Sequence, residues 1–223
     1  MAQSPQTLEG WHARFEAYWA EAPGGDLDAA HDLNHLRRVW RSAQSIARAE
    51  AREGGAVDLT VLLAATYFHD LVNPPKNSPL RAQASALSGR EAKPLLAGMG
   101  FPQDRLDAVA HAIEAHSYSA GVEPVTAEAR VLQDADRLEA LGAIGLARCF
   151  YTGGKMGTSL WHPDDPMGKG DRVKDDARFS TDHFQMKLLR LPGMMRTREG
   201  RRMAERRARV LKLFLKELEA ELG

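Results

Sequence analysis

His69 and Asp70 stand side by side at the end of an apolar run, and this pair is the most informative chemical feature of the chain. The run extends from Leu59 to Phe68, and the segment Asn73-Pro74-Pro75 follows the pair. An imidazole nitrogen and a carboxylate oxygen both bind divalent metal ions. Neighbours on a regular helix point about 100° apart, so both reach one ion more easily near a helix end. The prolines predict such an end.

Two further segments supply donors of the same kinds. His31 and His35 are four residues apart, which places both on one face of a helix. Asp134 and Asp136 lie in an otherwise apolar helical segment, where a buried carboxylate needs a cation or a hydrogen-bond donor. Two His nitrogens and two Asp oxygens would suit Mn, Fe, Co, Ni or Zn, and a six-coordinate ion would keep positions open for water and substrate. Open positions are typical of catalytic metal sites.

Each of these residues also has a simpler explanation. A lone His on an apolar face is commonly a hydrogen-bonded core residue, and the dipeptide His69-Asp70 is common by chance. His31 fits a helix cap or a surface residue better than a ligand, and Asp134 could pair with a neighbouring arginine. The ordered combination of His35, the His-Asp pair and a later acid is more specific than any single member.

Helical periodicity along the chain predicts the elements that must position these donors. Asp58 is the expected N-cap of the third helix, which is apolar all round and therefore central. A connection as long as residues 151–180 is typical of a lid or binding loop. No alternating strand pattern is visible, so the sequence predicts an all-α protein with a single domain over residues 1–223, a metal-binding core at about 27–150 and C-terminal helices at 181–222. The expected helices cover residues 5–21, 31–52, 59–68, 80–98, 102–116, 126–150, 181–191 and 198–222.

Composition and charge exclude several classes of protein. The 223 residues carry 30 Lys+Arg and 30 Asp+Glu, and this zero net charge argues against a broad nucleic-acid or membrane-surface binder. The basic stretch 198–209 keeps an apolar helical stripe, which favours the solvated face of a packed helix. The single Cys149 excludes an internal disulfide and fits a reducing cytosol. No signal peptide or membrane span is visible, so we expect a cytoplasmic protein.

The order His35, His69-Asp70 and then the segment 135–138 (Ala-Asp-Arg-Leu) resembles the HD-domain superfamily of metal-dependent phosphohydrolases. The resemblance implies an HD-type helical bundle in which His35, His69, Asp70 and Asp136 bind the metal. Asp134 is the alternative fourth ligand. Residues two apart lie on different faces of a helix, so we expect only one of the two acids to bind the ion. The implied cofactor is one divalent ion, Mn²⁺ in first place, with Mg²⁺, Fe²⁺, Co²⁺, Ni²⁺ and Zn²⁺ as alternatives.

The segments 133–148, 183–192 and 195–197 resemble the small bacterial branch of this family, to which nucleotide pyrophosphohydrolase activity is assigned. This resemblance implies hydrolysis of nucleoside or deoxynucleoside triphosphates to a monophosphate and pyrophosphate. A phosphomonoesterase, a cyclic phosphodiesterase and a non-catalytic nucleotide-binding sensor are alternatives on the same fold. We expect a small phosphorylated partner, no nucleic acid, no membrane, and a monomer or homodimer. A zinc-protease motif over residues 31–35 is disfavoured, because it needs Glu where Asp32 stands.

Polar side chains near these motifs are candidates for contacts with substrate phosphates, although each could equally be a solvated surface group. Asp70 would orient the attacking water, and nearby cationic groups would stabilise developing charge. His111 and His116 are five residues apart and point about 140° away from each other, so only His116, at the frayed end of its helix, is the expected functional residue. The candidate catalytic residues are Asp70, Lys76, Arg81 and His116, and the candidate substrate-binding residues are Asn77, Arg148, His183 and Lys187.

Overall fold

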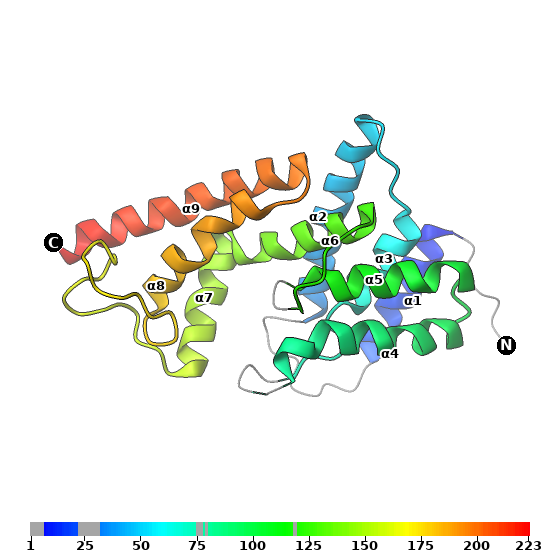
Figure 1. Ribbon diagram of the computed structural model, residues 1–223, viewed down its shortest axis with the longest axis horizontal. Helices are drawn as coiled ribbons and strands as arrows, with labels where there is room; N and C mark the ends of the chain where they lie inside the picture. The colour runs from blue at the N-terminus through cyan, green and yellow to red at the C-terminus, as the bar shows by residue number, and fades with distance from the viewer. Residues whose placement is uncertain (1–6, 22–31, 75–77, 79, 118–119) are drawn as a thin grey trace. The chain divides into compact units, whose positions relative to one another are not determined.

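The computed structural model describes residues 7–21, 32–74, 78, 80–117 and 120–223 (Figure 1). They fall into two compact units, residues 1–136 and residues 137–223. In the described residues every regular element is a helix, apart from an isolated bridge between Ser159 and Phe179. The all-α prediction is therefore confirmed, while the single domain over residues 1–223 stays a prediction.

The first unit is built around one fully apolar helix. This helix, α3 (Leu59–Phe68), buries every residue from Val61 to Phe68 and packs against α1, α2, α4 and α5. The helices predicted over residues 5–21, 31–52, 59–68, 80–98 and 102–116 are confirmed over the described residues, with ends that differ by a few residues. The other helices are α1 (Leu8–Glu21), α2 (Leu33–Arg52), α4 (Ala84–Gly98), α5 (Leu106–His116) and α6 (Ala127–Arg137), and the 3-10 turns η1 (Arg81–Gln83) and η2 (Gln103–Arg105) precede α4 and α5.

Both ends of α3 bear on the site. The predicted N-cap is confirmed, because the Asp58 carboxylate accepts hydrogen bonds from Thr60 N at 2.9 Å and Val61 N at 3.2 Å. Arg105 Nε also donates to Asp58 Oδ2 at 2.7 Å, which fastens the start of α3 to the segment before α5. At the other end α3 stops at Phe68, with His69 as its C-cap. The His-Asp pair thus lies at a helix end, as predicted.

Helices α4 and α5 approach each other closely at a glycine. A Cβ atom built on Gly89 of α4 would lie 2.9 Å from Ala110 O of α5, closer than ordinary van der Waals contact. Gly89 therefore allows the two backbones to pack together, and α5 carries His116 at its last position. Close packing of α4 thus supports the helix that ends in this histidine.

The single helix predicted over residues 126–150 is wrong. Helix α6 ends at Arg137, a 3-10 turn η4 (Leu138–Ala140) follows, and α7 (Gly142–Met156) begins afresh. Gly142 has a φ of +72°, a left-handed conformation that only glycine adopts readily. The helical periodicity continues through this segment, so it concealed a break that the glycine permits.

The second unit contains α7, α8 (Ser180–Met186), the 3-10 helix η5 (Leu188–Met194) and α9 (Arg198–Leu222). The predicted connection 151–180 is shorter than expected, since α7 continues to Met156 and the connection covers residues 157–179. Within it Arg172 donates to both carboxylate oxygens of Asp182, at 2.6 and 2.5 Å. This ion pair, with Asp182 buried and Arg172 partly exposed, fastens the connection to α8. Its role as a lid stays a prediction.

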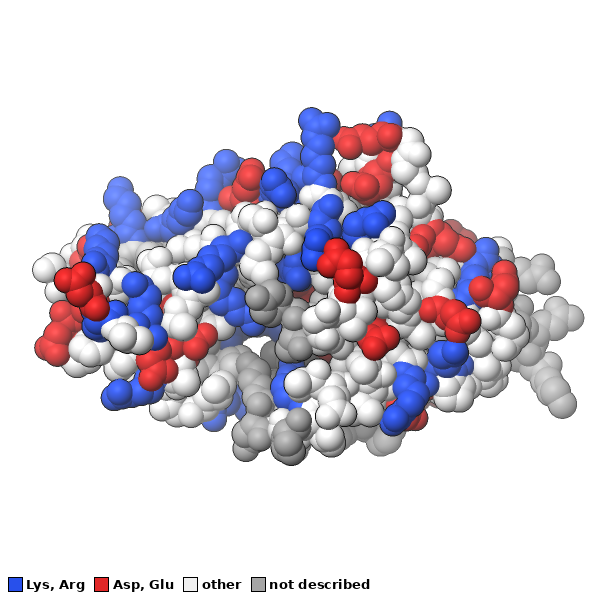
Figure 2. All heavy atoms as spheres, in the orientation of Figure 1, with Lys and Arg blue, Asp and Glu red and all other residues white. Residues whose placement is uncertain are grey.

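Charges of both signs are spread over the face of the molecule drawn in Figure 2. In the basic stretch of α9, Arg202 pairs with Glu199 of the same helix at 2.6 Å, so part of its charge is compensated. Of the helices that the structure describes, none combines the length and the apolar character needed to cross a bilayer. The expected absence of nucleic-acid binding stays a prediction.

Candidate metal centre

His35 enters the centre from the first turn of α2. Asp32 caps this helix, because its carboxylate accepts a hydrogen bond from His35 N at 2.8 Å. The cap sets the start of α2 so that the His35 side chain points inward, where it is fully buried. Asp32 therefore has a structural role, while its neighbour His31 lies outside the described residues.

His69 and His116 are oriented in the same way. His69 Nδ1 donates to Thr66 O at 2.8 Å and His116 Nδ1 donates to Ile113 O at 2.5 Å, in each case the carbonyl three residues earlier. These bonds leave the Nε2 atom of each ring as an acceptor. The two rings meet edge to face with centroids 4.8 Å apart. Each bond is made to a backbone carbonyl, which every residue carries, so residue types alone do not reveal this orientation.

Four donor atoms from three segments converge in the first unit. His35 Nε2 lies 3.4 Å from His69 Nε2, and Asp136 Oδ1 lies 3.6 and 3.7 Å from these two nitrogens. Asp70 Oδ2 lies 3.4 Å from His69 Nε2 and 3.9 Å from His35 Nε2. Ligands about 2.1 Å from an ion are separated by about 3.0–4.2 Å, depending on geometry. His35, His69 and Asp136 therefore fit a divalent metal ion in both chemistry and spacing, and Asp70 lies beside the two histidines.

The electrostatics of the centre favour a cation. Burial lowers the pKa of His69, but the negative charges of Asp70 and Asp136 outweigh this effect and raise the pKa well above its usual value of 6.5. Burial alone would raise the pKa of Asp136, but the His69 hydrogen bond and charge lower it strongly. Without a metal, a proton on His69 would supply the positive charge that these carboxylates require.

His116 differs from His69 in its electrostatics. Burial and the nearby His69 lower its pKa, and its Nε2 lies 3.9 Å from Asp70 Oδ1. A neutral His116 can accept a proton or a hydrogen bond at Nε2. Asp70 thus faces the metal donors with one oxygen and His116 with the other.

Geometry distinguishes the two acids that the sequence left open. Among the described residues, two groups of donors lie close enough for one ion: His35, His69 and Asp136, and His69, Asp70 and His116. Asp134 is fully buried and belongs to neither group. The arrangement therefore favours Asp136 as the fourth ligand.

The candidate phosphate contacts have different outcomes. Arg81 donates to Asn73 Oδ1 at 2.5 Å and to Pro74 O at 3.3 Å, so its guanidinium fastens the segment that follows the His-Asp pair. Lys76 and Asn77 lie outside the described residues. The remaining candidates belong to the second unit and stay predictions: Arg148 on α7, His183 on α8, whose Nδ1 lies 2.9 Å from Asp176 Oδ2, and Lys187 directly after α8.

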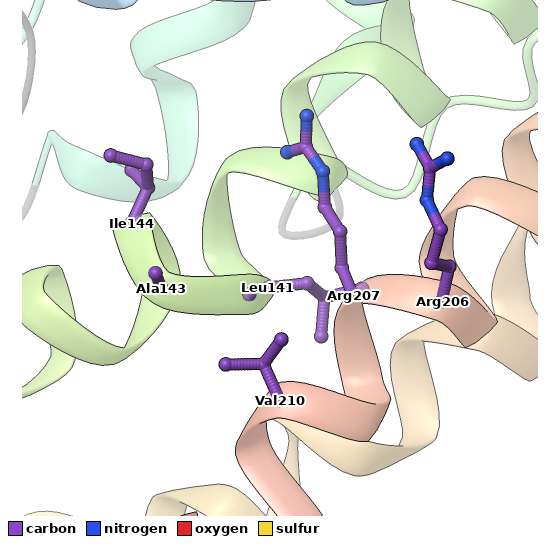
Figure 3. A pocket seen from close by; sticks show the side chains of 7 residues that line it. Leu141, Ala143, Ile144, Arg206, Arg207 and Val210 are labelled. Atoms are coloured by element: carbon purple, nitrogen blue, oxygen red, sulfur yellow. The ribbon is translucent and has the colours of Figure 1, made fainter.

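The second unit has an open pocket of its own, of about 300 Å³ (Figure 3). It contains none of the predicted site residues. Arg207 lines it and donates to Leu138 O at 2.6 Å. The other lining residues are Leu141, Gly142, Ala143, Ile144, Arg206 and Val210.

The HD domain family model matches residues 32–141, a span that contains all four candidate metal ligands and His116. A solved structure of an HD-superfamily hydrolase from Bacillus thuringiensis is also similar, with a TM-score of 0.68, 26% identity and coverage of 96% of this chain and 98% of that one. The chain belongs to the HD-domain superfamily. The resemblance inferred from the sequence is confirmed, and the helical HD fold agrees with the all-α architecture.

This HD protein is also similar to YpgQ of Bacillus subtilis (strain 168), an uncharacterised protein, with 32% identity over 208 residues that cover 92% of this chain and 90% of that protein. A crystal structure of YpgQ in complex with ADP superposes with a TM-score of 0.68 at 28% identity, covering 96% of each chain. A relative that spans nearly the whole chain therefore binds a nucleotide.

Proposed function

We propose that this protein is a divalent-metal-dependent phosphohydrolase that hydrolyses nucleoside or deoxynucleoside triphosphates to a monophosphate and pyrophosphate. The convergence of His35, His69, Asp70 and Asp136 within one HD domain carries this proposal. The ADP complex of the relative YpgQ supports a nucleotide as the ligand.

The four donors would hold one ion, with Mn²⁺ as the first choice. When bound, such an ion lowers the pKa of a water molecule and polarises a phosphoryl oxygen. His69 and His35 supply neutral nitrogens, while Asp70 and Asp136 supply the negative charge that balances the ion. The hydrogen bond from His69 Nδ1 to Thr66 O keeps the Nε2 lone pair directed at the centre.

Asp70 and His116 are placed to manage the attacking water. Asp70 Oδ1, 3.9 Å from His116 Nε2, would orient the water, and the neutral His116 would accept its proton. In this scheme Arg81, Lys76, Asn77, Arg148, His183 and Lys187 would bind the phosphates or stabilise their developing charge.

The test uses the purified full chain, first treated with a chelator and then loaded with Mn²⁺. It is incubated with a panel of nucleoside and deoxynucleoside triphosphates, a phosphomonoester and a cyclic dinucleotide, and ³¹P NMR identifies the products. Pyrophosphate and a monophosphate are expected. Release of inorganic phosphate alone would indicate a phosphomonoesterase, and cleavage of the cyclic substrate a phosphodiesterase.

The matched variants are His69→Ala, which removes a donor, and Arg105→Gln, which breaks an ion pair at the far end of α3. The first should lose activity and the second should keep it. Binding of Mn²⁺ and nucleotide without turnover of any substrate would refute catalysis and favour a sensor.

A further inference from the structure

Glu16 of α1 joins α2 and α3 through a polar cluster in which Tyr67 is buried, Glu16 is partly exposed and Arg37 is exposed. The Tyr67 hydroxyl, on α3, donates to Glu16 Oε1 at 2.5 Å, and Arg37 Nε, on α2, donates to both carboxylate oxygens at 3.0 and 2.9 Å. The Tyr67 hydroxyl also accepts from His12 Nε2 at 2.8 Å. We name these four residues, His12, Glu16, Arg37 and Tyr67, the Glu16 cluster.

The Glu16 cluster lies behind the two helices that supply the metal-binding histidines. Tyr67 is two residues before His69, and Arg37 is two residues after His35. Two residues correspond to about 200° of helix rotation, so the clustered side chains leave their helices on the side opposite the histidines. One carboxylate on α1 therefore ties α2 to α3 from the rear, while their front faces meet at the candidate metal centre.

Aromatic packing brings α1 to the same end of α3. Phe15 and Tyr18 of α1 contact Phe68, with ring centroids 5.1 and 5.5 Å apart. Phe68 directly precedes His69. The contacts of α1 are thus concentrated at the end of α3 from which the His-Asp pair emerges.

The Tyr67 hydroxyl does more than fill space. Its ring is fully buried, and phenylalanine would occupy nearly the same volume without requiring a hydrogen-bond partner. A buried hydroxyl that meets a carboxylate imposes a defined distance and direction on the elements that carry them. Such a constraint matters where His35 Nε2 and His69 Nε2 must stay 3.4 Å apart.

We propose that Glu16, Tyr67 and Arg37 are positioning residues of the metal centre, which hold α2 and α3 at the separation where His35 and His69 face one ion. This inference rests on the proposed function only in requiring that the centre binds a metal. It requires no particular substrate.

The experiment measures metal binding directly, with Mn²⁺ titrations and the visible absorption spectrum of Co²⁺-loaded protein, at a temperature where circular dichroism shows each variant folded. Tyr67→Phe should raise the Mn²⁺ dissociation constant about 10-fold, a size typical of residues that orient metal ligands, and should change the Co²⁺ spectrum. Glu16→Gln keeps an acceptor for Tyr67 but loses the charge that Arg37 meets, so a smaller rise is expected.

Arg105→Gln is the matched control, because it removes a comparable ion pair, with Asp58, at the opposite end of α3. It should lower the melting temperature and leave metal affinity and the Co²⁺ spectrum unchanged. A merely structural role for the Glu16 cluster predicts the same pattern for Tyr67→Phe.

Wild-type affinity and spectrum in folded Tyr67→Phe would overturn the positioning role, and so would an equal loss of affinity in Arg105→Gln. If Tyr67→Phe does not fold, Glu16→Gln decides by the same criterion. If the wild-type protein binds neither Mn²⁺ nor Co²⁺, the metal centre of the proposed function is itself refuted, and the positioning role with it. Loss of the positioning role alone would leave the proposed function intact.

Discussion

Replacing Asp136 with asparagine tests the metal centre most directly. Asp136 Oδ1 lies 3.6 Å from His35 Nε2 and 3.7 Å from His69 Nε2, so it faces both nitrogens of the donor set. Asparagine has the same shape and keeps one carbonyl oxygen, but it loses the negative charge. The matched control is Asp134→Asn, the same substitution two residues earlier on α6, at a buried acid outside the donor groups.

The expected loss can be bounded. Residues that only orient a ligand change metal affinity by about 10–100-fold, so removal of a charged donor should cost at least about 100-fold, or about 2.7 kcal/mol. With Mn²⁺ at about 100 times the wild-type dissociation constant, the metal stabilises the folded wild type by about 2.7 kcal/mol. For a chain of this size that raises the melting temperature by about 5–11 °C. In Asp136→Asn the same Mn²⁺ concentration contributes only about 0.4 kcal/mol, or about 1–2 °C.

The assay is a thermal melt of chelator-treated protein with and without Mn²⁺, each variant compared with its own metal-free form. Isothermal titration then gives the dissociation constants. Asp134→Asn should keep the full metal-induced shift, whatever it does to the metal-free protein. A full shift in Asp136→Asn together with a lost shift in Asp134→Asn would refute the assignment and make Asp134 the ligand. Full shifts in both would place the ion elsewhere.

Three further predictions concern the centre and the helices that carry it. In the metal-free protein, burial lowers the pKa of His69, but its two neighbouring aspartates raise it well above 6.5. The protonated His69 therefore stabilises the folded state fully below about pH 6.5, and this contribution is lost as the pH rises through the folded-state pKa. Thermal melts from pH 6 to 9 should therefore show the melting temperature of the metal-free protein falling. The rise in melting temperature that Mn²⁺ causes should increase over the same range, because the ion displaces a proton. A Mn²⁺-induced rise that is independent of pH would contradict this prediction. His116→Gln should lower kcat about 10²–10⁴-fold with nearly unchanged Mn²⁺ affinity, as expected for a proton acceptor, and unchanged kcat would remove it from the mechanism. Gly89→Ala should destabilise the protein by about 1–3 kcal/mol in urea unfolding, since its Cβ would lie 2.9 Å from a backbone oxygen of α5. The control Gly98→Ala has open space around the new Cβ and should be neutral or slightly stabilising.

The sequence by itself determined the features that depend on neighbours along the chain. The apolar run of α3, its cap at Asp58 and its end before His69 follow from residue types within a few positions. The donor types of the metal centre were also readable, because buried histidines and acids on apolar helices need a cation or a partner. The family resemblance then ordered these donors into one set.

Tertiary structure decided the features that depend on distance across the fold. Helix periodicity does not distinguish Asp134 from Asp136, since both lie on α6. The family resemblance favoured Asp136, and the distances from its carboxylate to His35 and His69 in the fold support the same choice. The break at Gly142 was hidden for a related reason: local propensity permitted the helix to continue, while the glycine adopted a left-handed conformation.

The Glu16 cluster shows the same principle. Glu16 and Tyr67 are 51 positions apart, and no local pattern connects them. A hydrogen bond requires two atoms within about 3 Å, and a metal ion requires four or more ligands at about 2.1 Å. Such tolerances arise when helices pack against one another, and helical propensity alone does not contain them.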